Sequence, residues 1–280
     1  KITSECGAVG WGETYGGTEF RMALERVKNA VIGQSPANVE RAKLLMFEVA
    51  PGVRSGYEVA MLDLAGKILG VSLSELVGGR VRDEVEVSGY FFYHYADENF
   101  GENMSAEAMV EEAKMWVEKH GFTTLKVKGG VLDPDEEIET MRGLRAAFPD
   151  SKLRIDPNQI WSLSTAVRVG QALAEDLEYL EDPVYGIEAM AKLRQLIRVP
   201  LATNMCVVEF AHIPAAIRTD AVDVILSDHH FWGGLWASKH LAKICEMLGM
   251  GVSMHSNSHL DISMAAMIHL AATTPNLSYA

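Results

Sequence analysis

Six polar residues follow short apolar runs at intervals of about 25 residues, which is the length of one strand plus one helix in a β/α repeat. Their side chains supply oxygen donors, an ammonium group and an imidazole. The six residues are Lys128, Asp156, Glu181, Asn204, Asp228 and His255. If each run is a strand of a parallel barrel, the six side chains meet at the face formed by the C-terminal strand ends. This combination of groups predicts metal-assisted acid–base chemistry.

Three of these residues present only oxygen. Asp156, Glu181 and Asn204 therefore suit a hard divalent cation such as Mg²⁺. A single Asp after a strand is more often a helix N-cap, and Asn also suits turns, but three coincidental caps in successive units are a poor explanation. Asp182 and Glu188 compete with Glu181 as ligand. Glu181 is preferred because it directly ends its strand.

Lys126 and Lys128 alternate along one apolar run, so their side chains point the same way. Two ammonium groups on one face of an interior strand are costly unless they serve an anion. A neighbouring positive charge and a nearby metal lower the pKa of a lysine, which makes a neutral amine available as a base. The alternative is a solvated edge strand.

Asp228 and His255 end consecutive strand–helix units, so their side chains can touch. A carboxylate that holds an imidazole fixes its tautomer and raises its basicity, as a general acid/base requires. The run 255–259 is dense in polar groups directly after an apolar strand, which favours ligand contact. His229 and His230 stay unassigned, since they could simply line a loop.

The elements that would position these residues alternate regularly from Val85 onward. Strands are predicted at 85–92, 123–128, 152–156, 177–181, 199–203, 222–227 and 250–254. Helical patterns lie between them, including 105–119 and 232–248, and Asp133-Pro134 is a typical helix start. Seven strands are one short of a closed eight-stranded barrel. A doubly wound open sheet is the alternative, but it gathers ligands at one switch point.

The first 82 residues differ in pattern. Residues 7–17 are typical of a strand that leads into a Gly-rich loop, whereas 18–33 and 56–70 have helical periodicity, and Gly70 is placed to end the second helix. The chain begins without Met and stops without a closing helix. The sequence pattern also changes abruptly between Met46 and Gly56, as if a loop were missing there. We therefore expect a partial protein, with a partial capping domain over 1–82 and a barrel domain over 83–280 that lacks its last unit.

Composition excludes several classes. The net charge of −13 argues against a nucleic acid or an anionic membrane as partner. The three cysteines have no metal-type spacing, which fits a reducing cytoplasm, and no apolar run approaches the length needed to span a bilayer. A cytoplasmic enzyme is the expectation.

The motif order Lys-x-Lys, Asp-Pro-Asn, Glu-Asp-Pro, Thr-Asn-Met, Ser-Asp-His-His-Phe-Trp and His-Ser-Asn-Ser-His resembles the enolase superfamily. Within it, the chain resembles the acid-sugar dehydratases of the mandelate racemase branch, the glucarate dehydratases above all, in which the third metal ligand is Asn. The resemblance covers roughly 83–274. It implies an α/β fold: a modified (β/α)₇β TIM-type barrel with an N-terminal α+β capping domain.

The resemblance also implies roles for individual residues. Asp156, Glu181 and Asn204 would hold Mg²⁺, Lys128 would be one base with Lys126 supporting it at the substrate carboxylate, and His255, oriented by Asp228, would be the opposite acid/base. The implied substrate contacts are Asn158, Tyr90, Ser256, Asn257, Lys126 and, more weakly, Ser55.

The implied activity is Mg²⁺-dependent dehydration of a small dicarboxylic sugar acid of the glucarate type. The α-proton is removed to give a metal-stabilised enediolate, and the β-hydroxyl then leaves as water. Relatives of this kind are usually homo-oligomers. The alternatives are another superfamily reaction, racemisation or cycloisomerisation, and a catalytically silent relative.

Overall fold

The computed structural model describes the chain except for residues 99, 258 and 280. It contains two compact units, which we treat separately. Unit 1 combines Lys1–Val85 with Leu226–Tyr279, and unit 2 is Glu86–Ile225. These units are not the family domains expected from the sequence, so the division at residues 82 and 83 stays a prediction.

Parallel strands in chain order form the core of unit 2. They are β3 (Gly89–Phe92), β4 (Thr124–Lys128), β5 (Lys152–Asp156), β6 (Leu177–Glu181), β7 (Leu201–Thr203) and the start of β8 (Val224–Ser227). Each strand pairs in parallel with the next along the chain. In unit 1, the end of β8 is joined by β9 (Gly251–Met254), where the His255 backbone N–H donates to the Ser227 carbonyl. Seven strands were predicted, and seven occur in the described part of this sheet.

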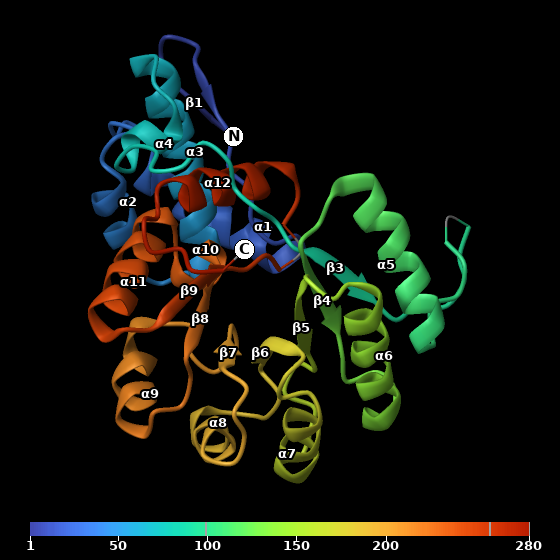
Figure 1. Ribbon diagram of the computed structural model, residues 1–280. Coiled ribbons are helices and arrows are strands. Elements are labelled where there is room, and N and C mark those ends of the chain that lie inside the picture. The colour runs from blue at the N-terminus through green and yellow to red at the C-terminus, as the bar shows by residue number, and fades with distance from the viewer. Residues whose placement is uncertain (99, 258, 280) are drawn as a thin grey trace. The chain divides into compact units, whose positions relative to one another are not determined.

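Helices connect the strands of unit 2. They are α5 (Ala106–His120), α6 (Pro134–Ala147), α7 (Leu163–Ala172), α8 (Ile187–Arg194) and, after the 3₁₀ turn η2 (Phe210–His212), α9 (Ile213–Thr219). Figure 1 shows α5 to α8 following one another along the outer side of strands β3 to β7. Residues at the N-terminal ends of two of these helices cap them. Ser105 caps α5, and Asp133 with Glu136 forms a capping box at the start of α6. The predicted helix starts at 105 and 134 are confirmed.

The alternation within β4 explains how lysines come to lie inside the protein. Leu125 and Val127 are fully buried on one face of the strand. Lys126 and Lys128 point to the other face, because successive side chains of a strand alternate. Arg154 and Tyr179 continue that inner face on the next strands, with the Arg154 guanidinium 4.5 Å from the Tyr179 ring centroid. The inner face of strands β4 to β6 therefore carries polar and aromatic groups.

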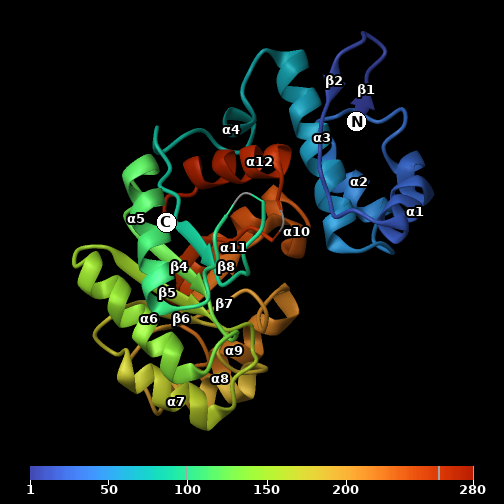
Figure 2. The same ribbon diagram turned by 90° about the vertical axis from the view of Figure 1, so that its right-hand side faces the viewer.

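Unit 1 begins with a small antiparallel pair, β1 (Ile2–Thr3) and β2 (Val9–Gly10), followed by helices. These are α1 (Thr18–Val27), the 3₁₀ turn η1 (Lys28–Ala30), α2 (Val39–Leu45), α3 (Pro51–Leu69) and α4 (Leu73–Leu76). Figure 2 shows the long helix α3 beside this small sheet and the helices α1 and α2. The helix predicted over 18–33 ends at Val27, and the predicted strand within 7–17 is only two residues long. The helix predicted over 56–70 is present, but it begins earlier, at Pro51, and ends at Leu69, with Gly70 at φ 72° directly after its end as predicted.

Two glycines divide the segment that the sequence predicted as one helix over 232–248. The structure has the short helix α10 (His229–Trp232), then Gly233 and Gly234 at φ 85° and 131°, and then α11 (Leu235–Leu248). The last helix, α12, covers Asp261–Ala272. A Cβ atom at position 234 would overlap the buried carboxylate of Glu58 on α3. Residue 234 must therefore be glycine while Glu58 occupies that space.

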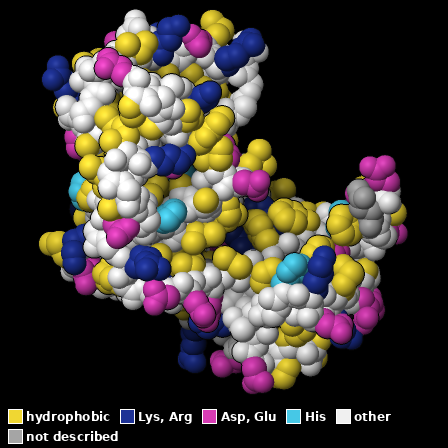
Figure 3. All heavy atoms as spheres, turned by 90° about the horizontal axis from the view of Figure 1, so that it is seen from above, with side chains coloured by type: hydrophobic (Ala, Val, Ile, Leu, Met, Phe, Trp, Pro, Cys, Tyr) yellow, Lys and Arg dark blue, Asp and Glu magenta, His cyan; other side chains and the backbone are white. Residues whose placement is uncertain are grey.

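The expected α/β fold class with a TIM-type barrel sheet is confirmed by this topology. None of the helices in the described ranges 1–98, 100–257 and 259–279 is long and apolar enough to cross a membrane. On the face of the molecule drawn in Figure 3, basic side chains lie among acidic ones.

Candidate active site

The lysines of β4 and the carboxylates that end β5 and β6 form one charged cluster in unit 2, made of Lys126, Lys128, Asp156 and Glu181. Lys126 Nζ lies 2.5 Å from Glu181 Oε1 and 3.4 Å from Asp156 Oδ2. Lys128 Nζ donates to Asp156 Oδ2 at 2.5 Å. The register produces this arrangement, because Lys128 pairs with Asp156 across β4 and β5. Both carboxylates are fully buried.

Proton affinities within the charged cluster follow from burial and from the neighbouring charges. Burial alone would lower the pKa of Lys126, but the carboxylates of Glu181 and Asp156 outweigh it and raise the pKa. The expected lowering of a lysine pKa, which included the effect of a nearby metal, stays a prediction. Burial opposes ionisation of Asp156, yet the two ammonium groups lower its pKa. Burial raises the pKa of Glu181, and the Lys126 ammonium group opposes this shift.

Of the three acidic residues considered as metal ligands near β6, the structure favours Glu181. Its Oε2 atom is buried and has no hydrogen-bond partner among the described residues. Asp182, by contrast, has both oxygens engaged: Oδ1 accepts from the Thr203 hydroxyl at 2.6 Å and Oδ2 from the Asn204 backbone N–H at 2.7 Å. Glu188 is exposed on α8. Glu181 therefore offers an oxygen that Asp182 does not.

Asn204 is held in place at the end of β7. Glu181 pairs with Ala202 in the parallel register of β6 and β7, so Asn204 lies two residues beyond that pairing. Its side chain is buried, and its backbone N–H is held by Asp182. Burial raises the pKa of Asp182 to about 7, against the effect of the hydrogen bonds from Thr203 and Asn204. Asp182 thus connects the ends of β6 and β7.

Two further predicted contacts adjoin the charged cluster. The ring of Tyr90 on β3 has Lys126 Nζ 4.8 Å from its centroid, and Lys128 Nζ lies 6.0 Å away. Asn158 accepts from Lys128 Nζ at 2.7 Å, and its backbone N–H donates to Asp156 Oδ1 at 2.9 Å. Asn158 has φ 52°, a left-handed conformation that turns the chain sharply after β5. Lys128 is therefore positioned by Asp156 and by Asn158.

In unit 1, Asp228 and His255 are in contact, as their spacing predicted. His255 Nδ1 lies 3.1 Å from Asp228 Oδ2. The other carboxylate oxygen, Oδ1, accepts from the His230 backbone N–H at 2.8 Å and lies 3.3 Å from His259 Nε2. Burial opposes ionisation of Asp228, but the hydrogen bonds from His255 and His259 lower its pKa. Asp228 is therefore an anion that orients two imidazoles.

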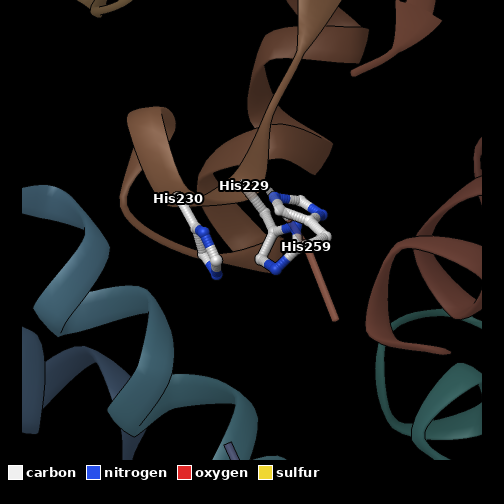
Figure 4. A group of neighbouring side chains, drawn as sticks. All are labelled: His229, His230 and His259. Carbon is white, nitrogen blue, oxygen red and sulfur yellow. The ribbon is translucent and has the colours of Figure 1, made fainter. Parts of the chain in front are cut away.

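The sequence left His229 and His230 unassigned and considered His259 only as part of the polar run 255–259, yet the structure brings the three imidazoles together (Figure 4). Burial lowers the pKa of His229 to about 3, and it also lowers the pKa of His230. Both imidazoles are therefore neutral near pH 7. The only sequence signal was two consecutive histidines after a strand, and nothing in the spacing linked them to His259.

The remaining predicted contacts lie in unit 1. Ser256 and Asn257 follow β9, where Ser256 is half-buried and Asn257 exposed. Ser55 is fully buried within α3, and its hydroxyl has no hydrogen-bond partner among the described residues. The charged cluster belongs to unit 2 and the Asp228–His255 pair to unit 1. Their convergence on one pocket stays a prediction, as do the individual roles of all these residues.

Comparison with protein families gives two matches along the chain. The family described as the mandelate racemase / muconate lactonizing enzyme N-terminal domain matches residues 1–78. The family described as enolase C-terminal domain-like matches residues 108–280.

Curated relatives cover nearly all of the chain. It is 42% identical to a probable glucarate dehydratase of Streptomyces coelicolor, an alignment that covers 100% of this chain and 73% of the relative. A D-galactarolactone cycloisomerase of Agrobacterium fabrum is 27% identical, with coverage of 99% and 75%. The family therefore includes more than one reaction.

Solved structures match closely as well. An enolase of Gibberella zeae complexed with magnesium, formate and sulfate matches with a TM-score of 0.96 at 43% identity, over 100% of this chain and 71% of that one. An enolase of Pseudomonas fluorescens with bound magnesium, potassium and tartrate matches with a TM-score of 0.94 at 38% identity, over 99% and 72%. Matches of this extent establish that the chain belongs to the enolase superfamily, in its mandelate racemase and muconate lactonizing enzyme group.

Proposed function

We propose that this protein is a Mg²⁺-dependent dehydratase of a glucarate-type acid sugar. The observation that supports it most is the charged cluster, in which two ammonium groups and two buried carboxylates meet at adjoining strand ends. The 42% identity to a probable glucarate dehydratase supports the same reaction class.

The donor set fits Mg²⁺. Asp156, Glu181 and Asn204 would hold the ion, since all three are buried at successive strand ends and offer oxygen. The buried Glu181 Oε2 without a partner is an atom that a cation would satisfy. When bound, Mg²⁺ supplies positive charge that offsets the negative charge developing on a substrate carboxylate as its α-proton is lost. Magnesium is present in both structural relatives described above.

Lys126 and Lys128 would have different roles toward the substrate. Lys126 lies between two carboxylates, which raise its pKa and keep it protonated. It is therefore suited to bind the substrate carboxylate and not to remove a proton. Lys128 would be the base. Its ammonium group now donates to Asp156 and Asn158, and engagement of Asp156 by a divalent cation would weaken the stronger of these bonds.

His255 would act as the second acid/base. Asp228 accepts from its Nδ1 position and so orients the ring, and we assign the proton exchange with the substrate to the other ring nitrogen, Nε2. We expect His255 to protonate the departing β-hydroxyl when Lys128 takes the α-proton. With the roles of the two reversed for the other configuration, both epimers would be substrates.

The ligand charge is consistent with a diacid substrate. Two carboxylates and one carboxamide leave a bound Mg²⁺ site nominally neutral, whereas three carboxylates would leave it negative. A neutral site repels a dianion less. A tartrate, which is a small hydroxy diacid, is bound by one structural relative. The assembly into a homo-oligomer stays a prediction.

Cycloisomerisation or racemisation of another carboxylate is the second candidate, and the galactarolactone cycloisomerase relative favours it. A screen of acid sugars, lactones, muconate and mandelate separates the two. Formation of a keto-deoxy diacid from an aldarate supports the dehydratase. Turnover of a lactone, muconate or mandelate without any aldarate turnover rejects it.

Variants test the assigned residues. Lys128→Met and His255→Asn should each reduce aldarate turnover by about 10²–10⁴-fold for at least one epimer. Lys152→Met is the matched control, because Lys152 is an exposed lysine that pairs with Glu178 at the other end of β5. Full activity in both site variants would contradict the mechanism. A wild-type chain that exchanges no α-proton with deuterated solvent would indicate a catalytically silent relative.

A further inference from the structure

Three imidazoles in unit 1 face one another outside the charged cluster. His229 and His230 come from the short helix α10, and His259 comes from the segment before α12. Each offers one ring nitrogen, and these three atoms all lie within 4.8 Å of one another. The ring centroids are 4.5 Å apart for His229–His230, 4.5 Å for His230–His259 and 4.8 Å for His229–His259. Figure 4 shows the three rings gathered in one place. We call them the imidazole trio.

The imidazole trio is buried and has unsatisfied polar atoms. His229 is fully buried, and neither of its ring nitrogens has a hydrogen-bond partner among the described residues. The same is true of Nδ1 of His230 and Nδ1 of His259. Leaving buried polar atoms unsatisfied is costly, so four such nitrogens in one place call for a partner that the described side chains do not supply.

The remaining ring nitrogens of the trio point to oxygen atoms. His230 Nε2 lies 2.9 Å from the Ser263 hydroxyl, and His259 Nε2 lies 3.3 Å from Asp228 Oδ1. A carboxylate that accepts from Nε2–H of His259 places the proton there and leaves the lone pair on Nδ1. Metal-binding histidines usually donate their other N–H in this manner to a carboxylate or another oxygen.

We propose that His229, His230 and His259 bind a transition-metal ion of the Zn²⁺ class, at a site separate from the oxygen ligands at the strand ends. Neutral imidazole nitrogens suit Zn²⁺, whereas Mg²⁺ prefers oxygen, so the two sites select different ions. With Zn–N distances of about 2.0–2.1 Å, nitrogens in a tetrahedral site lie about 3.3 Å apart. The rings therefore have to close slightly on binding. The ion would tie α10 to the segment before α12.

The first test is zinc binding by the metal-stripped full-length chain in the presence of excess Mg²⁺. Equilibrium dialysis should show one Zn²⁺ retained per chain, and the thermal midpoint should rise with Zn²⁺ concentration. Zinc X-ray absorption should show imidazole nitrogens around the ion. No retained zinc, or a coordination shell of oxygen alone, would overturn the proposal, because Zn²⁺ would then have no site or only the one proposed for Mg²⁺.

Matched variants locate the ion. Ser263→Ala removes only the oxygen partner of His230 and should weaken Zn²⁺ binding by about 10–100-fold. His229→Gln should abolish stoichiometric binding. His240→Gln, at an exposed histidine on α11, should change nothing. If His229→Gln does not fold, Ser263→Ala and the absorption spectrum of the wild type decide the matter. The site is refuted if Ser263→Ala binds Zn²⁺ as tightly as the wild type and the absorption spectrum of the wild type does not show three imidazoles around the ion.

Discussion

The charged cluster of unit 2 and the group of histidines around Asp228 in unit 1 stabilise buried polar groups in different ways. In the charged cluster, two ammonium groups alternate with two carboxylates, and each charge has an opposite charge within 3.4 Å. Around Asp228, a single carboxylate is surrounded by imidazoles and a backbone N–H. The first arrangement balances two charges against two, whereas the second places one carboxylate near His229 and His230, whose pKa values are lowered by burial.

This difference has a consequence for substitutions. Removing one member of a balanced set leaves a buried charge without compensation, which affects stability strongly. Removing one neutral imidazole leaves a cavity or an unsatisfied hydrogen bond, which costs less. The single carboxylate of the second group is the exception, because both of its histidine partners depend on it.

Asp228→Asn should reduce aldarate turnover by up to about 10⁴-fold. The amide cannot hold His255 and His259 as the carboxylate does, so the tautomer and the basicity of His255 change. The measurement is kcat and KM as a function of pH, which separates loss of a proton carrier from loss of substrate binding. A variant with normal kcat at every pH would show that Asp228 only caps α10.

Lys126→Met should lower the free energy of unfolding by about 3–5 kcal/mol, because Glu181 and Asp156 lose a shared buried cation. The measurement is urea unfolding at neutral pH, with Lys152→Met as the exposed control, for which a change of at most about 1 kcal/mol is expected. Equal effects in the two variants would contradict the account of the charged cluster as a balanced set.

Glu58 on α3 tests a third case, a buried carboxyl that accepts from the Trp236 backbone N–H and has one ammonium group, that of Lys43, beside it. Lys43 Nζ lies 3.8 Å away, and burial raises the pKa of Glu58 to about 7. A carboxyl with a raised folded pKa stabilises most below the unfolded pKa, near 4.5, and that contribution is lost as pH rises through 7. In the wild type, the free energy of unfolding should fall by about 3 kcal/mol as pH rises from below 4.5 to above 7, and Glu58→Gln should remove this fall. Parallel stability–pH curves for the variant and wild type would refute this assignment.

Thr203→Val should have the smallest effect. The free energy of unfolding should fall by about 1–2 kcal/mol, because Asp182 Oδ1 loses its hydroxyl donor. The change should also raise KM for Mg²⁺, since Asp182 holds the Asn204 backbone. Thr219→Val, at an exposed position on α9, is the control. An unaltered response to Mg²⁺ would separate Asp182 from the proposed metal site.

Periodicity alone predicted the strands well. Strand-like runs such as 123–128 and 152–156 differ from β4 and β5 by at most a residue, because apolar side chains that face the helices alternate with polar ones that face inward. The contact between Asp228 and His255 also followed from spacing, since consecutive strand ends are neighbours. The Asp133 start of α6 was predictable because a capping box is a local feature.

Other features depend on contacts distant in the sequence and could not be predicted in this way. The single helix expected over 232–248 ignored Gly233-Gly234, where Glu58 from α3 fills the space beside the chain. The imidazole trio joins histidines about 30 residues apart, on elements whose packing no local pattern specifies. The raised pKa of Lys126 reflects two carboxylates from other strands, whereas the sequence argument considered its lysine neighbour and a nearby metal.

The space shared by Glu58 and residue 234 constrains how this protein can vary. A larger residue at 234 meets two obstacles, the Glu58 carboxylate and a φ of 131° that strains any residue with a Cβ. A shorter residue at 58 would remove only the first obstacle, so we expect glycine at 234 in related chains whatever residue occupies position 58. Because residue 234 also ends the turn after α10, a substitution there would shift His229 and His230 without altering either histidine.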